Sequence, residues 1–279
     1  MELEEVACPL CGISSDVIWG RENGFIARRC EDCGVAYVSP RPTVAAIDEA
    51  TRLGQHRTDA GVLKVEYRPI PSSLKLYRGK IRAAFAERID AGRPLSWLDI
   101  GAGYGELVAV AMDILPPGSS VLGVEPMEAK ARAAQAHGLP VRACTLDSLE
   151  GSFDVISLMN VFSHLPDFRS FLGDLARLLK PDGSLFLRTG NGGDLSRRAD
   201  YPDKLDLPDH LVFAGRSSLR RILEEQGLTV TWEDTERLDT VRGAAKLMVK
   251  KALGKPVPFL LPYTSPFRDC FVRADRTMV

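Results

Sequence analysis

The chain has 279 residues, of which 45% are hydrophobic and 26% are charged, and its formal net charge is −1 at pH 7. This composition fits one α/β domain with a small accessory module and excludes a disordered or fibrous chain. The near-neutral charge disfavours nucleic acid as a partner, because attraction to phosphate backbones needs a basic excess.

Four of the six cysteines form two close pairs near the amino terminus. Two residues separate Cys8 from Cys11, two separate Cys30 from Cys33, and glycine follows each pair. Two facing turns of this kind can supply the tetrahedral four-thiolate shell that zinc prefers, and glycine permits the positive φ that such turns need. We therefore predict a zinc ribbon over residues 1–42 with a closed, structural site. Free thiols or a redox pair are the alternative.

Residues 43–90 are predicted to form a helical connector, and the rest of the chain (91–279) an α/β domain. In that domain short apolar runs alternate with helical stretches, which is typical of a parallel sheet. The predicted strands are Leu95–Ile100, Ser120–Val124, Pro140–Ala143, Phe153–Leu158, Ser184–Arg188, Leu228–Trp232 and Cys270–Arg273.

An insertion over 233–269 precedes the last predicted strand. Its basic stretch, 241–255, contains Arg242, Lys246, Lys250, Lys251 and Lys255 and no acidic residue. We interpret it as a solvated helix face, with a peripheral membrane contact or an anionic substrate as the alternative.

A glycine-rich turn follows the first predicted strand of the α/β domain. The segment from Trp97 to Leu107 runs from strand to helix and carries Gly101, Gly103 and Gly105, with Asp99 before them. Such a turn lets a ligand lie against bare backbone at the start of a helix. The spacing differs from the dinucleotide-binding pattern, which places its third glycine one residue later.

This turn resembles motif I of the class I S-adenosylmethionine-dependent methyltransferases, and the resemblance extends over residues 95–232. It implies a Rossmann-like seven-stranded fold with S-adenosylmethionine as cofactor. Glu125, at the end of the second strand, matches the acidic residue that takes both ribose hydroxyls, and an ionised carboxylate offers two acceptor oxygens for that diol. The remaining positions implied to contact the cofactor are Asp99, Gly101, Gly103, Tyr104, Gly105, Thr145, Leu146 and Asn160. Tyr104 could instead pack against the connector.

A ribbon followed by this domain resembles methyltransferases of sugars, glycans and natural products. A sulfonium methyl is already activated, so the protein must align a nucleophile and remove its proton. His164 and His210 lie at predicted carboxyl ends of strands and are the candidate bases. Each could instead fix a loop by hydrogen bonds, an alternative that is stronger for His164. His56 and His137 are interpreted as surface residues.

The predicted reaction is methyl transfer to a small molecule, with a sugar, glycan or natural product as acceptor. The alternatives are an RNA methyltransferase that recognises its substrate through the ribbon, and a binding module without catalysis. Residues 1–42 carry four Arg, no Lys and seven acidic residues, which disfavours the RNA hypothesis. The acidic start and the absence of a long apolar run lead us to expect a cytoplasmic protein.

Overall fold

The computed structural model describes residues 2–58, 61–64, 71–190, 192–195, 197–201, 204–237, 245, 248–249, 251–254 and 267–277. Most of the basic stretch, with Arg242, Lys246, Lys250 and Lys255, lies outside these residues. None of the helices in the described part is long and apolar enough to cross a membrane.

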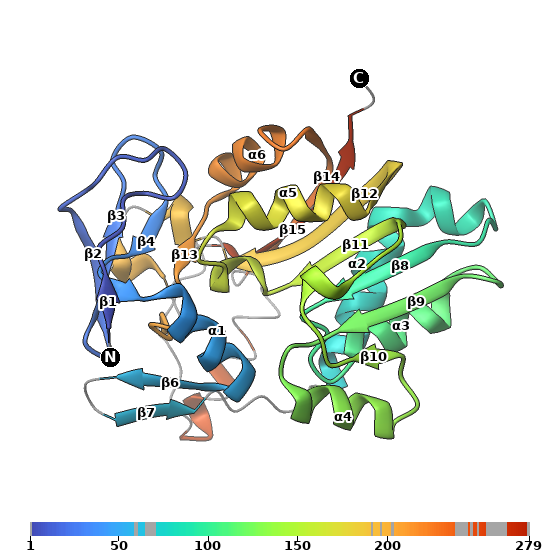
Figure 1. Cartoon of the computed structure of the whole chain (residues 1–279), viewed down its shortest axis with the longest axis horizontal. Coiled ribbons are helices and arrows are strands. Elements are labelled where there is room, and N and C mark those ends of the chain that lie inside the picture. Colours follow the sequence, from blue (N-terminus) through green and yellow to red (C-terminus); the bar gives the residue numbers. More distant parts are fainter. Residues whose placement is uncertain are drawn as a thin grey trace.

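A seven-stranded sheet forms the centre of the molecule (Figure 1). Its order is β10-β9-β8-β11-β12-β15-β14, in which β15 is antiparallel to both neighbours and the other adjacent pairs are parallel. The strands are β8 (Ser96–Ile100), β9 (Ser120–Val124), β10 (Val141–Arg142), β11 (Phe153–Met159), β12 (Leu179–Gly190), β14 (Leu228–Arg237) and β15 (Phe267–Arg276). All seven predicted strands are present, and the Rossmann-like methyltransferase fold is confirmed.

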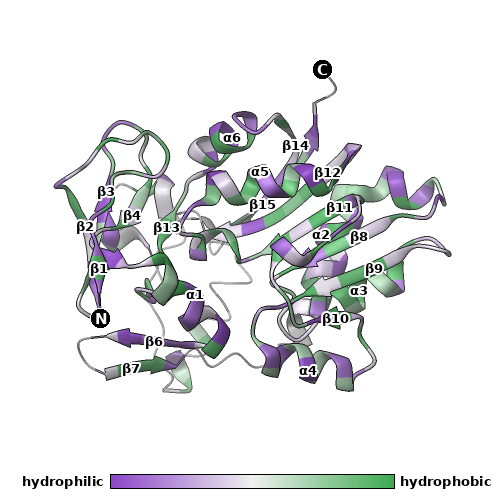
Figure 2. Ribbon diagram, viewed as in Figure 1, coloured by the Kyte–Doolittle hydropathy of each residue, from purple (hydrophilic) through white to green (hydrophobic). Residues whose placement is uncertain are grey.

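Helices cover both faces of this sheet because its strands bury side chains on both sides. On one face, Trp97 and Phe186 pack with α2 (Pro71–Asp90) and α3 (Glu106–Ile114). On the other, Leu98 and Leu187 pack with α5 (Phe168–Leu178) and α6 (Arg216–Glu224). The helix α4 (Glu128–Ala136) packs beside β10. Figure 2 shows the hydrophobic residues gathered along the central strands.

The amino-terminal module is a small antiparallel sheet joined edge to edge with a later segment. Its strands are β2 (Ile18–Glu22), β3 (Phe25–Arg29), β4 (Ala36–Val38) and β13 (Val212–Phe213), in the order β13-β4-β3-β2. A two-stranded pair, β1 (Leu3–Glu4) with β5 (Arg41–Pro42), closes its base. The ribbon therefore includes a strand from far outside residues 1–42.

The connector is not helical throughout. Helix α1 (Val44–Leu53) ends at Gly54, whose φ of +64° stops the helix, and a hairpin follows. The hairpin pairs β6 (Gln55–Thr58) with β7 (Gly61–Lys64). The expectation of a helix is wrong over this hairpin, because long-range contacts described below hold His56 inward. Short 3₁₀ turns lie at Leu146–Ser148, Phe162–His164, Gly192–Asp194 and Arg198–Asp200.

Candidate active site

The glycine turn lies at the carboxyl end of β8, where the strand passes into α3. Gly101, Gly103 and Gly105 have φ of +69°, +57° and +84°, a region that favours glycine. A Cβ on Gly101 would come within 2.5 Å of Val161 Cγ2, whereas one on Gly103 would meet nothing within 4 Å. Gly103 therefore presents bare backbone to an open side of the turn, as a cofactor cradle requires.

Glu125 follows β9 and is 5% exposed. Its Oε2 accepts the Gly103 N–H at 2.8 Å, and its Oε1 accepts the Met127 N–H at 3.0 Å. Each carboxylate oxygen has about two acceptor positions, so one position on each oxygen remains for a vicinal diol. The carboxylate is thus held against the glycine turn in an orientation suited to a ribose.

Asp99 lies within the sheet beneath the turn. The Ser157 hydroxyl donates to Asp99 Oδ1 at 2.5 Å and accepts from Trp97 Nε1 at 2.9 Å. Burial raises the pKa of Asp99 to about 7. Because its hydrogen bond to Ser157 lies inside the sheet, Asp99 supports the turn from below, and a direct contact with the cofactor stays a prediction.

The other expected cofactor residues surround the same edge of the sheet. Thr145 follows β10 and is exposed. Leu146, the first residue of the next 3₁₀ turn, is half-buried. Tyr104 is half-buried beside the glycines. Asn160 directly follows β11 and has a φ of +59°, and its N–H donates to Arg188 O at 2.9 Å. These positions follow neighbouring strands, as the sequence predicts, and their roles remain expectations.

A cavity of about 590 Å³ opens at the carboxyl ends of β11 and β12. Its walls come from the two strand ends, the hairpin and the segment before β13. Among its lining residues are Leu63, Lys64, Asn160, His164, Arg188, Tyr201, Lys204, Asp209, His210 and Phe213. The structure thus brings both candidate histidines and Asn160 to one cavity. His137, in contrast, is exposed on α4's end, as expected.

His164 is held by Asp209 at the cavity wall. Its Nδ1 lies 2.8 Å from Asp209 O and 3.1 Å from Asp209 Oδ1, so it is the protonated nitrogen and Nε2 remains for the cavity. Burial alone would lower the pKa of His164, but the Asp209 carboxylate outweighs burial and raises it. The pKa of Asp209 is held well below its usual range, against the effect of burial, by His164 and His56.

His56 is the third member of this group, and the expectation that it is a surface residue is wrong. It is 5% exposed, and its Nε2 lies 2.9 Å from Asp209 Oδ1. The hairpin turns it inward so that Asp209 accepts from two imidazoles. A lone histidine in a connector carries no sequence signal for a partner more than a hundred residues away, so this contact was missed.

His210 lies beside His164 but in a different electrostatic setting. The two ring centroids are 4.7 Å apart, and His210 Nδ1 lies 2.9 Å from Leu205 O. Burial and the neighbouring charge of His164 lower the pKa of His210 to about 4. It is therefore neutral at physiological pH and a weaker base than His164.

Lys130, on α4, is a further residue that sequence reasoning missed. Burial lowers the pKa of Lys130, while the carboxylates of Glu125 and Asp209 act to raise it. The ammonium therefore lies within electrostatic reach of Glu125, the candidate ribose ligand, and of Asp209, which binds the histidines. Lys130 is the third residue of α4, and nothing in the surrounding sequence indicates that this lysine is half-buried near the site.

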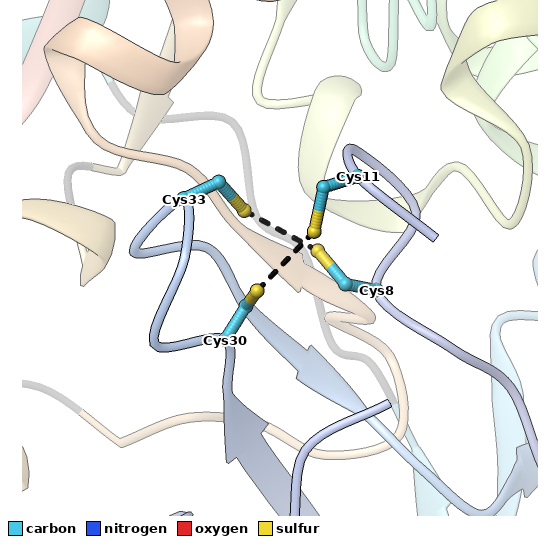
Figure 3. Close-up of side chains that lie close together, drawn as sticks. All are labelled: Cys8, Cys11, Cys30 and Cys33. Atoms are coloured by element: carbon cyan, nitrogen blue, oxygen red, sulfur yellow. Dashed lines mark hydrogen bonds between the residues drawn. The ribbon is translucent and has the colours of Figure 1, made fainter. Parts of the chain in front are cut away.

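The four amino-terminal cysteines converge from two loops (Figure 3). Cys8 Sγ lies 3.4 Å from Cys33 Sγ, Cys11 Sγ lies 3.3 Å from Cys30 Sγ, and all four sulfurs lie within 4.8 Å of one another. Gly12 N–H donates to Cys8 O, and Gly34 N–H donates to Cys30 O, with φ of +76° and +74° at the glycines. The glycine turns are those expected of metal-binding knuckles.

Comparison with known proteins assigns the larger domain. A family described as a methyltransferase domain matches residues 72–233. The chain belongs to this methyltransferase family. The S-adenosylmethionine-dependent class I resemblance is thereby confirmed at the level of family and fold, and with it the expectation of an enzyme.

Curated relatives are ubiquinone biosynthesis O-methyltransferases. The mitochondrial protein of Bos taurus is 34% identical over 168 residues, which are 50% of this chain and 43% of that protein. The protein of Parvibaculum lavamentivorans is 32% identical over 142 residues, which are 45% of this chain and 55% of the relative. The matched region thus spans about half the length of these relatives.

Among solved structures, a Galdieria sulphuraria protein assigned as a sarcosine dimethylglycine methyltransferase superposes with a TM-score of 0.54. The two chains are 16% identical, and the superposition covers 74% of this chain and 87% of that chain. This likeness supports the fold.

Proposed function

We propose that this methyltransferase moves the methyl group of S-adenosylmethionine to a hydroxyl of a small molecule, with a sugar, glycan or other natural product as the acceptor class. The observation that carries the proposal is the cavity beside Asn160, into which the His164–Asp209 pair faces. The O-methyltransferases among the relatives support an oxygen acceptor of small size.

The glycine turn and Glu125 fit the nucleoside part of the cofactor. Gly103 offers open backbone, and Glu125 retains acceptor capacity for two hydroxyls. When bound there, the cofactor supplies an activated methyl on a sulfonium sulfur. The chain's own task is to hold the acceptor oxygen in line and to take its proton.

His164 is the proposed general base. Its Nδ1–H is fixed by Asp209, so Nε2 would be the atom that takes the proton of the acceptor hydroxyl. The imidazolium that forms is stabilised by the Asp209 carboxylate, which His56 also orients. His210, with a pKa of about 4, is proposed to bind the acceptor rather than to take its proton.

The cysteine group is proposed to hold one structural zinc ion. With zinc–sulfur bonds of about 2.3 Å, tetrahedral thiolates lie about 3.8 Å apart, and the sulfur–sulfur separations of 3.3 and 3.4 Å are close to this spacing. A disulfide would need about 2.05 Å. Four protein ligands leave no open position, so the ion would stabilise the ribbon rather than take part in methyl transfer.

Titration calorimetry with S-adenosylmethionine tests the cofactor site. Glu125→Ala should weaken binding about 100-fold, because two charge-assisted hydrogen bonds to the ribose are lost. Glu128→Ala, which removes an exposed acid on α4, is the matched control and should bind like the wild type. Equal affinities in the two variants would remove the ribose assignment.

Incubation of the enzyme and S-adenosylmethionine with a library of sugars and metabolites tests the acceptor class. It should yield a product heavier by one methyl group.

A further inference from the structure

The segment Leu205–Phe213, here called the histidine strap, contributes both to the cavity wall and to the core of the ribbon. Its polar residues Asp209 and His210 line the cavity. Its apolar residues Leu205 and Leu207 are 0% exposed and pack in a hydrophobic cluster with Trp19 and other ribbon side chains. The strap therefore completes the core of the ribbon on one side and the wall of the cavity on the other.

The ribbon also holds the backbone of the strap. β13 pairs with β4, so that Val212 faces Tyr37, and Val38 N–H donates to Leu211 O at 2.9 Å. Figure 1 shows β13 beside β4 of the ribbon. The end of the strap, β13, is thus the edge strand of the ribbon's sheet.

Glu22, at the end of β2, binds the start of the strap. Its Oε2 accepts the Leu205 N–H at 3.0 Å, and its Oε1 accepts the Asp206 N–H at 2.7 Å. Next to it, Asn23 Nδ2 donates to Leu207 O at 2.7 Å. A carboxylate that accepts two successive backbone N–H groups fixes the direction of that backbone.

The candidate bases take their positions from the same backbone. His210 Nδ1 is bonded to Leu205 O, the carbonyl of the residue whose N–H Glu22 holds. His164 Nδ1 is bonded to Asp209 O, and Leu211 N–H donates to Ser163 O at 2.7 Å. A displacement of the strap would therefore move both imidazoles relative to the cavity.

We infer that the ribbon is a positioning device for the acceptor side of the active site, and that Glu22 is its main positioning residue. The ribbon sets the strap, and the strap sets the Asp209–His164 pair and His210. The inference that the ribbon positions catalytic groups rests on the proposed function of these histidines. The physical coupling between ribbon and strap does not depend on that function.

Hydrogen exchange measured by mass spectrometry on the full zinc-loaded chain tests the coupling. Glu22→Gln keeps the size of the side chain but weakens its bonds to the strap, so peptides covering 204–213 should exchange about tenfold faster. Peptides covering 96–125 and the zinc content should match the wild type. Glu31→Gln, an exposed ribbon acid, is the matched control and should leave the strap unchanged.

A spectroscopic readout separates positioning from general support. In a ¹³C-histidine sample, Glu22→Gln should shift the His210 ring signal and leave that of exposed His137 in place. Unchanged strap exchange in Glu22→Gln would overturn the inference, and so would equal acceleration across the whole chain. Calorimetry with S-adenosylmethionine on the wild type reports separately on the proposed function, because loss of that binding would leave the exchange result standing.

Discussion

The proposed cofactor side of the active site is made mainly from one stretch of backbone, whereas the proposed acceptor side is assembled from side chains that lie far apart in the sequence. Gly101, Gly103 and Gly105 stand in a single turn, and Glu125 follows the adjacent strand. His56, His164 and Asp209 come from a hairpin, a 3₁₀ turn and the histidine strap. The first site needs local conformation, while the second needs the ribbon, hairpin and sheet to be assembled together.

The largest expected effect comes from the ribbon, which contacts the acceptor side through the histidine strap. Cys30→Ser should abolish binding of the one zinc proposed per chain and lower Tm by about 10 °C or more, since a lost structural zinc removes about 5 kcal/mol or more. Metal analysis and calorimetric melting measure both quantities. Cys144→Ser, outside the cysteine group, is the control.

Below its lowered Tm, the Cys30→Ser variant should still bind S-adenosylmethionine within a few-fold of the wild type, because the hydrogen bonds that hold Glu125 come from Gly103 and Met127 and not from the ribbon. Loss of cofactor affinity in parallel with zinc would show that the two sides are not separate. Zinc content equal to that of the wild type would contradict the metal assignment itself.

The geometry of the proposed cofactor side was predictable because its physical requirements are local. A strand, three glycines with positive φ and an acid after the next strand are all visible in sequence, and the strands beneath them follow from short apolar runs. Even the ribbon cysteines fall into this class. Each pair sits in its own glycine turn, so the spacing alone indicates the convergence seen in Figure 3.

The acceptor side was not predictable in the same way. His56 was interpreted as a surface residue because its segment gives no sign of the hairpin or of Asp209. The sequence favours a loop-fixing role more strongly for His164 than for His210. In the structure, however, the ion pair with Asp209 raises the pKa of His164 and makes it the better base candidate. Tertiary pairing determines both features, and periodicity does not encode tertiary pairing.

The two histidines can be separated by their pH dependence. If His164 is the base, turnover should rise with pH up to a pKa above the usual 6.5, because only neutral imidazole accepts the proton. A rise in turnover centred near pH 4 would identify His210 as the base instead. His164→Gln should lower kcat about 100-fold or more, and His210→Gln less than about tenfold, with cofactor affinity unchanged in both. Equal losses would contradict this assignment.

The smallest expected effect concerns Lys130, the residue that lies in the field of both sides. Its positive charge lowers the pKa of His164, while Asp209 raises that pKa. Lys130→Met should therefore raise the His164 pKa by a few tenths of a unit, as expected for partly screened charges. Asp209→Asn should move it in the opposite direction and by more. Titration of the ¹³C-histidine signals measures both changes without an acceptor. A His164 pKa unmoved by Lys130→Met would contradict an electrostatic coupling between Lys130 and His164.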